Sequence, residues 1–355
     1  MKSVKGYSVR ILDNLDPQVH KNSPHFVRDL SSELELIVGD VRSADDMNRA
    51  LQGVEVAFHL AAQTGVGQSM YEIGSYIDTN VKGTAILWET IIKKRLRLEK
   101  VILASSRPVY GEGAHTCQEC GVVTPSPRSI EHLSKCDCEG RCPLCNRSTK
   151  AIPTPETHPL RPLSIYGLSK KMQEDICILE GTCHKIPIII LRYFNVYGNG
   201  QSLSNPYTGI ASIFSSRLLS AKSIEIYEDG NMIRDFVNIE DVVRANLFAL
   251  EKEGPQVLVT NVGSENPTTV LHLAEILQRK INPELNFIFS NRFRKGDIRA
   301  CYADLTIANK ELGSFSTIEL KEWIDQLVRW AKIQKVTDRY DQSVAEMKMY
   351  GILEH

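Results

Sequence analysis

Short apolar runs alternate with helical patterns over the first 110 residues of the chain. Four runs have the length and β-branched content of buried strands: 7–14 (YSVRILDN), 33–41 (ELELIVGDV), 54–62 (VEVAFHLAA) and 100–106 (KVILASS). Between them, residues 43–54 begin with a serine N-cap and end near a glycine, and residues 78–96 form a long amphipathic pattern. Because strands and helices alternate and the strands are continuously apolar, the pattern predicts an α/β fold with a doubly wound parallel sheet.

The pattern breaks from Thr116 to about Pro155. This stretch is rich in cysteine, proline, serine and glycine and has no long apolar periodicity, so it is interpreted as an insertion. Regular structure is predicted to resume with a helix over 165–184 and a strand over 186–198, followed by further α/β elements.

Composition narrows the class of protein. The 355 residues are 42% hydrophobic and 24% charged, with a formal net charge of −1. That balance favours neither nucleic-acid nor membrane-surface binding. No apolar run reaches the roughly 18–20 residues that span a bilayer, and no secretory signal is visible at the N-terminus. The sequence therefore predicts a cytoplasmic protein.

The cysteines are clustered rather than spread along the chain. Six of the nine lie between Cys117 and Cys145, including the CxxC pairs Cys117/Cys120 and Cys142/Cys145. Two such pairs about twenty residues apart have the spacing of a four-cysteine zinc ribbon, and thiolate coordination would order a segment too polar to build its own core. We expect structural zinc, with a redox dithiol as the alternative. Cys136 and Cys138 are surplus to a four-ligand site.

A candidate catalytic pair lies in the segment SIYGLSKKMQEDI. Tyr166 and Lys170 are four residues apart, so they share one face of the predicted helix. A nearby cation can lower the pKa of a tyrosine and make it a general base for a hydroxyl group. Ser105 and Ser106 end the predicted strand KVILASS, at the edge where open α/β sheets place their ligands.

Ser106, Tyr166 and Lys170, followed by LRYFNVYG, resemble the extended short-chain dehydrogenase/reductase family, specifically its nucleotide-sugar epimerases and dehydratases. The segments LDNL, GDV, HLAA, DTNVKGT, RDFVNIEDV and RKGDIRACYAD match the same family in order, from about residue 6 to residue 331. The resemblance implies a Rossmann-like domain formed by 1–112 and 158–198 that also receives about 235–263. It implies a smaller α/β sugar-nucleotide domain formed by 199–234 and 264–355, while 113–157 would be the zinc-ribbon-like insertion.

The resemblance also implies a chemistry. In this family bound NAD exchanges a hydride with the sugar, usually at C4, while the tyrosine moves the hydroxyl proton. Tyr166 would be the base, Lys170 its partner and ribose ligand, and Ser106 the residue that positions the hydroxyl group. Asp13 at a strand tip would bind the adenosine ribose and repel a 2′-phosphate, which favours NAD over NADP. By resemblance, the NAD-binding residues are Asp13, Asn14, Asp40, Val41, Leu60, Ala61, Ala62, Thr64, Asn80, Ser105, Tyr166, Lys170 and Tyr193.

The same resemblance assigns the substrate to Ser106, Asn195, Arg234 and Arg294, with the two arginines on the diphosphate. Resembling dehydratases carry an Asp–Glu pair directly after the serine or threonine. Here Arg107 and Pro108 follow it, and neither can transfer a proton at neutral pH. Epimerisation is therefore favoured over dehydration.

The substrate is harder to assign. The cysteine-bearing insertion together with NPYTGIASIFSSRLL resembles sequences assigned as dTDP-L-rhamnose 4-epimerases, which form dTDP-6-deoxy-L-talose. The alternatives are a UDP-glucose or UDP-N-acetylglucosamine 4-epimerase, a 4-ketoreductase that exchanges NAD(P)H, and an inactive member that only binds sugar nucleotide.

Two further expectations concern assembly and the N-terminus. Resembling proteins usually dimerise through the helices that correspond here to 78–95 and 165–184, which predicts a homodimer. Residues 1–6 are too few to supply the family's first strand and its GxxGxxG turn. The strand–turn–helix unit that carries this turn spans about 30 residues, and we expect about 25 of them to be absent. The fold would then be N-terminally truncated, and the glycine-rich turn that normally binds the pyrophosphate of NAD would be missing.

Overall fold

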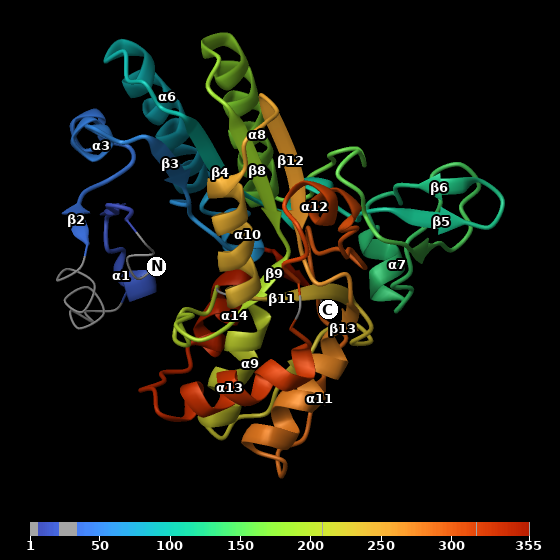
Figure 1. Ribbon diagram of the computed structural model, residues 1–355. Helices are drawn as coiled ribbons and strands as arrows, with labels where there is room; N and C mark the ends of the chain where they lie inside the picture. Colours follow the sequence, from blue (N-terminus) through green and yellow to red (C-terminus); the bar gives the residue numbers. More distant parts are fainter. Residues whose placement is uncertain (1–5, 21–33, 208, 317, 355) are drawn as a thin grey trace.

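The computed structural model describes residues 6–20, 34–207, 209–316 and 318–354. Its main sheet has four strands in the order β12-β8-β4-β3, and every pairing is parallel (Figure 1). The strands are β3 (Val56–His59), β4 (Lys100–Ser106), β8 (Ile188–Tyr193) and β12 (Val257–Val262). The predicted parallel α/β sheet is confirmed.

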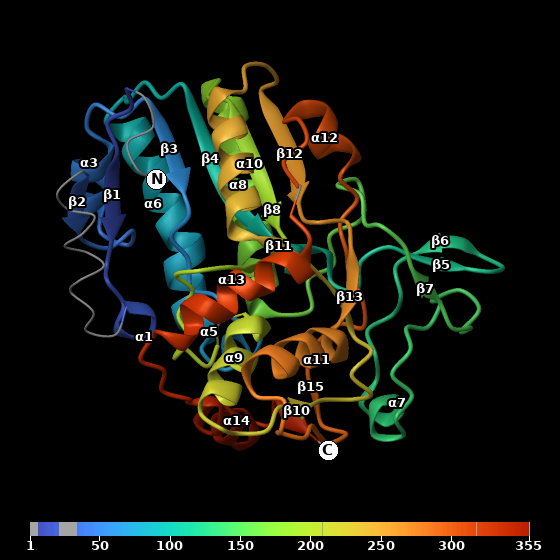
Figure 2. The ribbon, with the colours of Figure 1, turned by 60° about the horizontal axis from the view of Figure 1, so that its bottom comes forward.

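A separate pair of strands precedes this sheet in the sequence. β1 (Arg10–Asp13) and β2 (Glu35–Val38) pair in parallel, from Arg10 with Glu35 to Asp13 with Val38. Both views place them on the β3 side of the main sheet (Figure 2). No strand within the described ranges pairs with the second edge of β1 or of β3.

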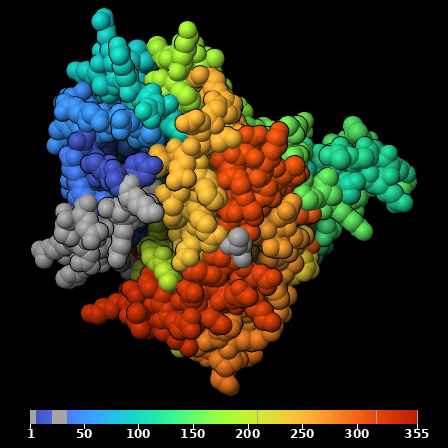
Figure 3. Space-filling view, viewed as in Figure 1, coloured from blue at the N-terminus to red at the C-terminus, as the bar shows by residue number. Residues whose placement is uncertain are grey.

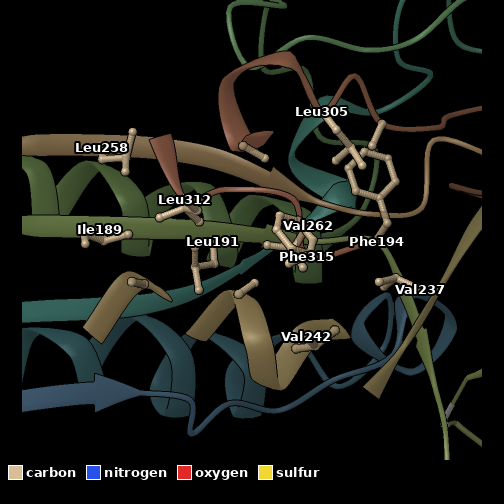
Figure 4. Close-up of a cluster of buried hydrophobic side chains, with 14 of the residues drawn as sticks. Ile189, Leu191, Phe194, Val237, Val242, Leu258, Val262, Leu305, Leu312 and Phe315 are labelled. Carbon is tan, nitrogen blue, oxygen red and sulfur yellow. The ribbon is translucent and has the colours of Figure 1, made fainter. Parts of the chain in front are cut away.

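Alternating side chains of the central strands pack into two hydrophobic cores, one on each face of the sheet. On β8, Ile188 and Ile190 join the core that includes α6 (Gly83–Lys93) and α8 (Ile165–His184). Ile189 and Leu191 point to the opposite face, as the period of two along a strand requires. Figure 4 shows them beside residues of β12, of α10 and of the segment around α12. The helices on this second face are α10 (Ile239–Glu251) and α12 (Thr306–Glu311).

Two predicted helices of the first half show how well local signals hold. α3 (Ala44–Leu51) begins as expected after Ser43, whose side chain accepts a hydrogen bond from the amide of Asp46. The predicted helix over 78–96 is not uniformly α-helical, because its first turn is the π-helix η1 (Ile77–Lys82) before α6 begins. π-Helical turns are rare and often occur at functional sites.

The C-terminal half builds a second, smaller body below the sheet. Its three-stranded sheet has the order β13-β11-β9, and a separate core packs its helices together. The strands are β9 (Asn195–Tyr197), β10 (Glu225–Ile226), β11 (Ile233–Asn238), β13 (Pro267–Thr269), β14 (Ile288–Phe289), β15 (Phe293–Arg294) and β16 (Leu353–Glu354). The helices are α9 (Ile210–Leu219), α11 (Val270–Ile281), α13 (Leu320–Lys332) and α14 (Tyr340–Met349).

The cysteine-rich segment follows β4 in the sequence and projects from the side of the protein (Figure 3). It contains the antiparallel sheet β6-β5-β7 and one short helix. These elements are β5 (His115–Cys117), β6 (Gly121–Val123), β7 (Lys150–Ala151) and α7 (Ile130–Ser134). The domain boundaries given above stay a prediction. None of the described helices is long and apolar enough to cross a membrane.

Candidate active site

The proposed catalytic residues lie at the carboxyl end of β4. Ser106 is the last residue of this strand, and Tyr166 lies in the first turn of α8, which packs against β4. The Ser164 side chain accepts a hydrogen bond from the amide of Gly167 at 3.1 Å, so it caps α8 at the point where Tyr166 enters the site. α8 has the bounds that the sequence pattern predicted.

Tyr166 has two polar neighbours in the site, Ser106 and Arg107. Burial raises the pKa of Tyr166, whereas a hydrogen bond with the Ser106 side chain and the charge of Arg107 lower it. The ring of Tyr76 meets that of Tyr166 edge-on, with centroids 6.3 Å apart. The structure thus brings Ser106 and Tyr166 together, as the sequence led us to expect.

Lys170 lies one turn further along α8 and is only 3% exposed. Its Nζ donates a hydrogen bond to the carbonyl oxygen of Ala104 at 2.7 Å. Burial lowers the pKa of Lys170 to about 8. The groups that lower the pKa of Tyr166 are Ser106 and Arg107, so the direct influence of Lys170 on Tyr166 stays a prediction.

Asn80 joins three parts of the site from inside the π-helix η1. Its Nδ2 donates to the Ser169 hydroxyl of α8 at 2.9 Å and to the carbonyl of Gln63 at 3.1 Å. The amide of Gln63 donates back to Asn80 Oδ1 at 2.7 Å. The fully buried Asn80 therefore fixes the loop after β3 against α8.

The residues proposed for the adenosine end of NAD lie at the tips of β1 and β2. Asn14 Nδ2 donates to Asp40 at 3.2 Å, and Arg42 donates to the same carboxylate at 2.7 Å. The hydrogen bonds from Arg42 hold the pKa of Asp40 well below its usual range. Asp13 accepts a hydrogen bond from the amide of Leu15 at 2.7 Å and lies 3.4 Å from His20.

The other residues proposed for NAD fall into two groups. The first lies at or near the tips of β2 and β3, and consists of Val41, Leu60, Ala61, Ala62 and Thr64. The second, Ser105 and Tyr193, has partners within the protein. Ser105 donates to Glu174, which is ion-paired with Arg192 at 2.7 Å. Tyr193 donates to Asn246 at 2.9 Å. The side chain of Ser105 thus belongs to a buried ion network.

The residues proposed for the substrate line the junction with the second body. Asn195 Oδ1 is buried and accepts no hydrogen bond from the described residues. Arg294 donates to Asp297 at 2.9 Å, and the charge of Asp297 also acts on the nearby Arg234. Arg107, Arg234 and Asp297 line one pocket. The sequence reasoning assigned no binding role to Arg107 or Asp297, although Asp297 lies in the matched segment RKGD.

The four cysteines of the two CxxC pairs form one cluster in the projecting segment. The sulfur atoms of Cys117, Cys120, Cys142 and Cys145 all lie within 4.8 Å of one another. Cys136 is exposed, and Cys138 is grouped instead with Glu228 and Asp229. The structure therefore selects the four expected cysteines from the six in this segment.

Comparison with known families agrees with this arrangement. The model of the NAD dependent epimerase/dehydratase family matches residues 3–134 and 145–263. The chain belongs to this family. Its members include the extended short-chain dehydrogenases/reductases that the sequence motifs resemble, and it is a family of enzymes. The match is interrupted only within the cysteine-rich segment.

Individual relatives share most of the chain's length. A dTDP-L-rhamnose 4-epimerase of Burkholderia thailandensis is 37% identical over 90% of this chain and 87% of its own length. A putative UDP-glucose 4-epimerase of Methanocaldococcus jannaschii is 32% identical, covering 92% of this chain and 91% of its own. The UDP-glucose 4-epimerase of Thermotoga maritima, solved with UDP-glucose, superposes with a TM-score of 0.72 at 29% identity, covering 92% of this chain and 91% of its own.

A fourth relative has been solved with both cofactor and substrate. The UDP-glucuronic acid 4-epimerase of Bacillus cereus, in complex with UDP-glucuronic acid and NAD, is 25% identical with a TM-score of 0.71, covering 92% of this chain and 91% of its own. These four proteins are all named as 4-epimerases of nucleotide sugars, yet the sugars and bases in their names differ.

Proposed function

We propose that this chain is an NAD-dependent nucleotide-sugar 4-epimerase that acts through a transient 4-keto sugar, and that it converts dTDP-L-rhamnose to dTDP-6-deoxy-L-talose. The observation that carries the reaction class is the hydrogen bond between Ser106 and Tyr166 at the carboxyl end of β4, with Lys170 buried one turn further along α8. The 37% identity with the dTDP-L-rhamnose 4-epimerase supports the choice of sugar.

Each residue of this group has a definite task in the proposed reaction. Tyr166 takes the proton of the C4 hydroxyl and later returns it, while Ser106 holds that oxygen in place. Because burial raises the pKa of Tyr166, the tyrosinate needs positive charge nearby when it forms. Lys170 is fixed by Ala104 and has further N–H donors that can face a cofactor ribose. NAD, when bound, supplies the hydride acceptor and donor.

The described residues fit NAD at its two ends. Asp13 presents a carboxylate and Asn14 a side-chain amide at the adenosine end, and Lys170 presents donors at the nicotinamide end. In the space between the edges of β1 and β3, none of the described residues forms a glycine-rich turn. No residue is therefore assigned to the pyrophosphate of the cofactor.

The experiment that tests this function compares purified wild-type protein with Tyr166→Phe. Denatured wild-type protein should release NAD, and native protein should epimerise dTDP-L-rhamnose without added cofactor. Tyr166→Phe should keep the NAD and lose turnover by at least about a hundredfold. Tyr350→Phe is the matched control, because this ring is 53% exposed and lies outside the site.

The alternatives give different results in the same assay. Turnover of UDP-glucose or UDP-N-acetylglucosamine alone would identify the other epimerases as the correct class. A strict requirement for added NAD(P)H would identify a 4-ketoreductase. Protein without NAD and without turnover of any of these sugars would identify an inactive member.

We further propose that the cysteine cluster binds one structural zinc ion. Four sulfur ligands within 4.8 Å of one another match a tetrahedral thiolate site. Metal analysis should find one zinc per chain, and Cys142→Ser should remove most of it. Cys183→Ser is the control, because Cys183 is exposed on α8 and lies outside the cluster. Full zinc content in Cys142→Ser would contradict the assignment.

The homodimer also remains a proposal. α6 and α8 expose the apolar residues Ile92, Leu168 and Leu179, which are 37%, 39% and 60% accessible in the single chain. Packing of these two helices against a second copy would bury that surface. Light scattering should therefore find a dimer, and Leu179→Lys should shift it toward the monomer.

A further inference from the structure

Arg107 follows the serine that ends β4 and begins the 3-10 helix η2 (Arg107–Tyr110). It is 8% exposed, and its Nη1 is buried without any hydrogen-bond partner. Within the described part of the chain, no carboxylate forms an ion pair with this guanidinium. A buried cation that lacks an anionic partner is unfavourable, so the position indicates a partner that comes from outside the chain.

The backbone holds Arg107 firmly in place beside α8. Gly111, at the end of η2, has φ +70°, and a Cβ there would lie 2.2 Å from the carbonyl oxygen of Arg161. A Cβ on Gly167 of α8 would lie 2.6 Å from the carbonyl oxygen of Pro108. These close approaches fix the turn that carries Arg107 against the first turn of α8, where Tyr166 lies.

On its other side Arg107 shares a pocket with Arg234. The guanidinium of Arg234 donates to the backbone carbonyl oxygens of Ile233 at 2.8 Å and Ile298 at 2.9 Å and to the sulfur of Met232 at 3.9 Å, and none of these acceptors carries a charge. Burial, and then the charge of Arg107, lowers the pKa of Arg234 to about 10, so the two cations are close enough to repel each other. The acid that lines this pocket, Asp297, is engaged by Arg294 at 2.9 Å.

The lining of this pocket therefore carries two guanidinium groups and one carboxylate, which Arg294 already engages, whereas Glu112 and Arg128, which also act on Arg234, have opposite charges. A dianionic group of matching geometry would relieve the repulsion, and phosphate oxygens pair well with guanidinium N–H groups. Arg107 shares the pocket with Arg234 and its charge acts on Tyr166, and under the proposed function these two residues face the diphosphate and the reacting sugar.

We propose that Arg107 is a third arginine of the substrate site, whose Nη1–H donates to the phosphate group next to the sugar of a nucleoside diphosphate sugar. The inference rests on the proposed function, because it assumes a nucleotide-sugar substrate. It gives Arg107 a binding role that is separate from the proton transfer assigned to Tyr166.

The test is the affinity for dTDP and for thymidine, measured by calorimetry with wild type, Arg107→Gln and Arg107→Lys. Arg107→Gln should weaken dTDP binding by about ten- to a hundredfold and leave thymidine binding within about twofold. Arg107→Lys should recover part of the dTDP affinity, because the charge remains while the fork of donors is lost. Arg161→Gln is the control, because Arg161 is an exposed arginine of the neighbouring segment.

Thermal unfolding separates binding from folding in the same variants. Since Arg107 has no internal anionic partner, Arg107→Gln should unfold at the wild-type temperature or above it. A dTDP affinity that changes by less than about threefold would overturn the proposal, as would equal losses for dTDP and thymidine.

The proposed function and this inference fail in different ways. If wild type binds neither dTDP nor UDP, the proposed function is wrong, and the inference that rests on it is wrong as well. If wild type binds UDP and uridine instead, the affinities of wild type and Arg107→Gln are compared for UDP and uridine in the same way. If wild type binds a nucleoside diphosphate tightly and Arg107→Gln binds it equally well, the inference alone is wrong.

Discussion

Arg128 connects the cysteine-rich projection to the rest of the protein through buried charges. Its Nε lies 3.3 Å from Glu112, its Nη1 donates to Glu228, and its Nη2 donates to the carbonyl oxygen of Asp297 at 2.9 Å. The side chains of Arg128, Glu112 and Glu228 are 3%, 1% and 2% exposed. Replacing Arg128 with leucine would leave two buried carboxylates without their main cation.

The expected cost is large for a single substitution. Removing one partner from a buried ion pair typically costs about 3–5 kcal/mol of unfolding free energy, because the remaining charge stays buried. Part of the loss is offset here, since Arg299 Nη1 remains 3.9 Å from Glu228 and the amide of Arg299 donates to Glu112 at 2.6 Å. We therefore expect Arg128→Leu to lose about 2–4 kcal/mol near neutral pH.

The pH dependence tests the electrostatic cause. Burial raises the pKa of Glu112, and Arg128 opposes that rise, so the pKa increases further in Arg128→Leu. The folded variant then binds a proton that the unfolded chain, with a pKa near ~4.3, releases. Its deficit is therefore largest at neutral and alkaline pH and shrinks as the pH falls toward the unfolded-state value.

Urea unfolding of wild type and variant at about pH 7.5 and about pH 5.5 measures this deficit. Arg147→Leu is the matched control on the same projection, because Arg147 and its partner Glu119 are 62% and 48% exposed. The control should lose less than about 1 kcal/mol. A deficit below about 1 kcal/mol in Arg128→Leu, or one that grows as the pH falls, would refute the reasoning.

Two further substitutions test the cofactor side of the site. Lys170→Met should abolish turnover yet raise the unfolding free energy by about 1–3 kcal/mol below pH 8, because the folded pKa of about 8 lies below the ordinary 10.5 and burial of the charge is unfavourable. Chemical unfolding should show this gain disappearing as the pH rises from 8 to 10.5, and a gain that persists there would contradict the cause. Asp13→Ala should reduce the preference for NAD over NADP by about tenfold in equilibrium binding, since it removes the carboxylate that repels a 2′-phosphate; an unchanged preference would exclude Asp13 from that role.

Periodicity and local motifs were sufficient for most of the fold. The serine at 43, the bounds of α8 and the buried strand β4 are properties of short segments, and the structure reproduces each of them. The first turn of the helix predicted over 78–96, which is the π-helix η1, was not predictable in this way. Its π-helical form places Asn80 against Gln63 and Ser169, and those partners lie 17 and 89 residues away in the sequence.

The residues of the candidate site that belong to family motifs were predictable from the sequence. The residues whose role depends on burial in the folded protein were not. Ser106 and Tyr166 meet as their motifs led us to expect. From the sequence alone, Arg107 served only as an argument against dehydration. An arginine in a sequence can equally be an exposed surface residue. Its unsatisfied Nη1 and its closeness to Arg234 depend on chain segments that meet only in the folded protein.

The fate of the C4 hydrogen tests the central claim most directly. dTDP-L-rhamnose that carries deuterium at C4 is incubated with the wild-type protein, and the product is examined by NMR. The account predicts dTDP-6-deoxy-L-talose that retains deuterium at C4, because the hydrogen leaves and returns as a hydride while Tyr166 moves only the hydroxyl proton. Product that has exchanged this deuterium for solvent hydrogen would contradict the account.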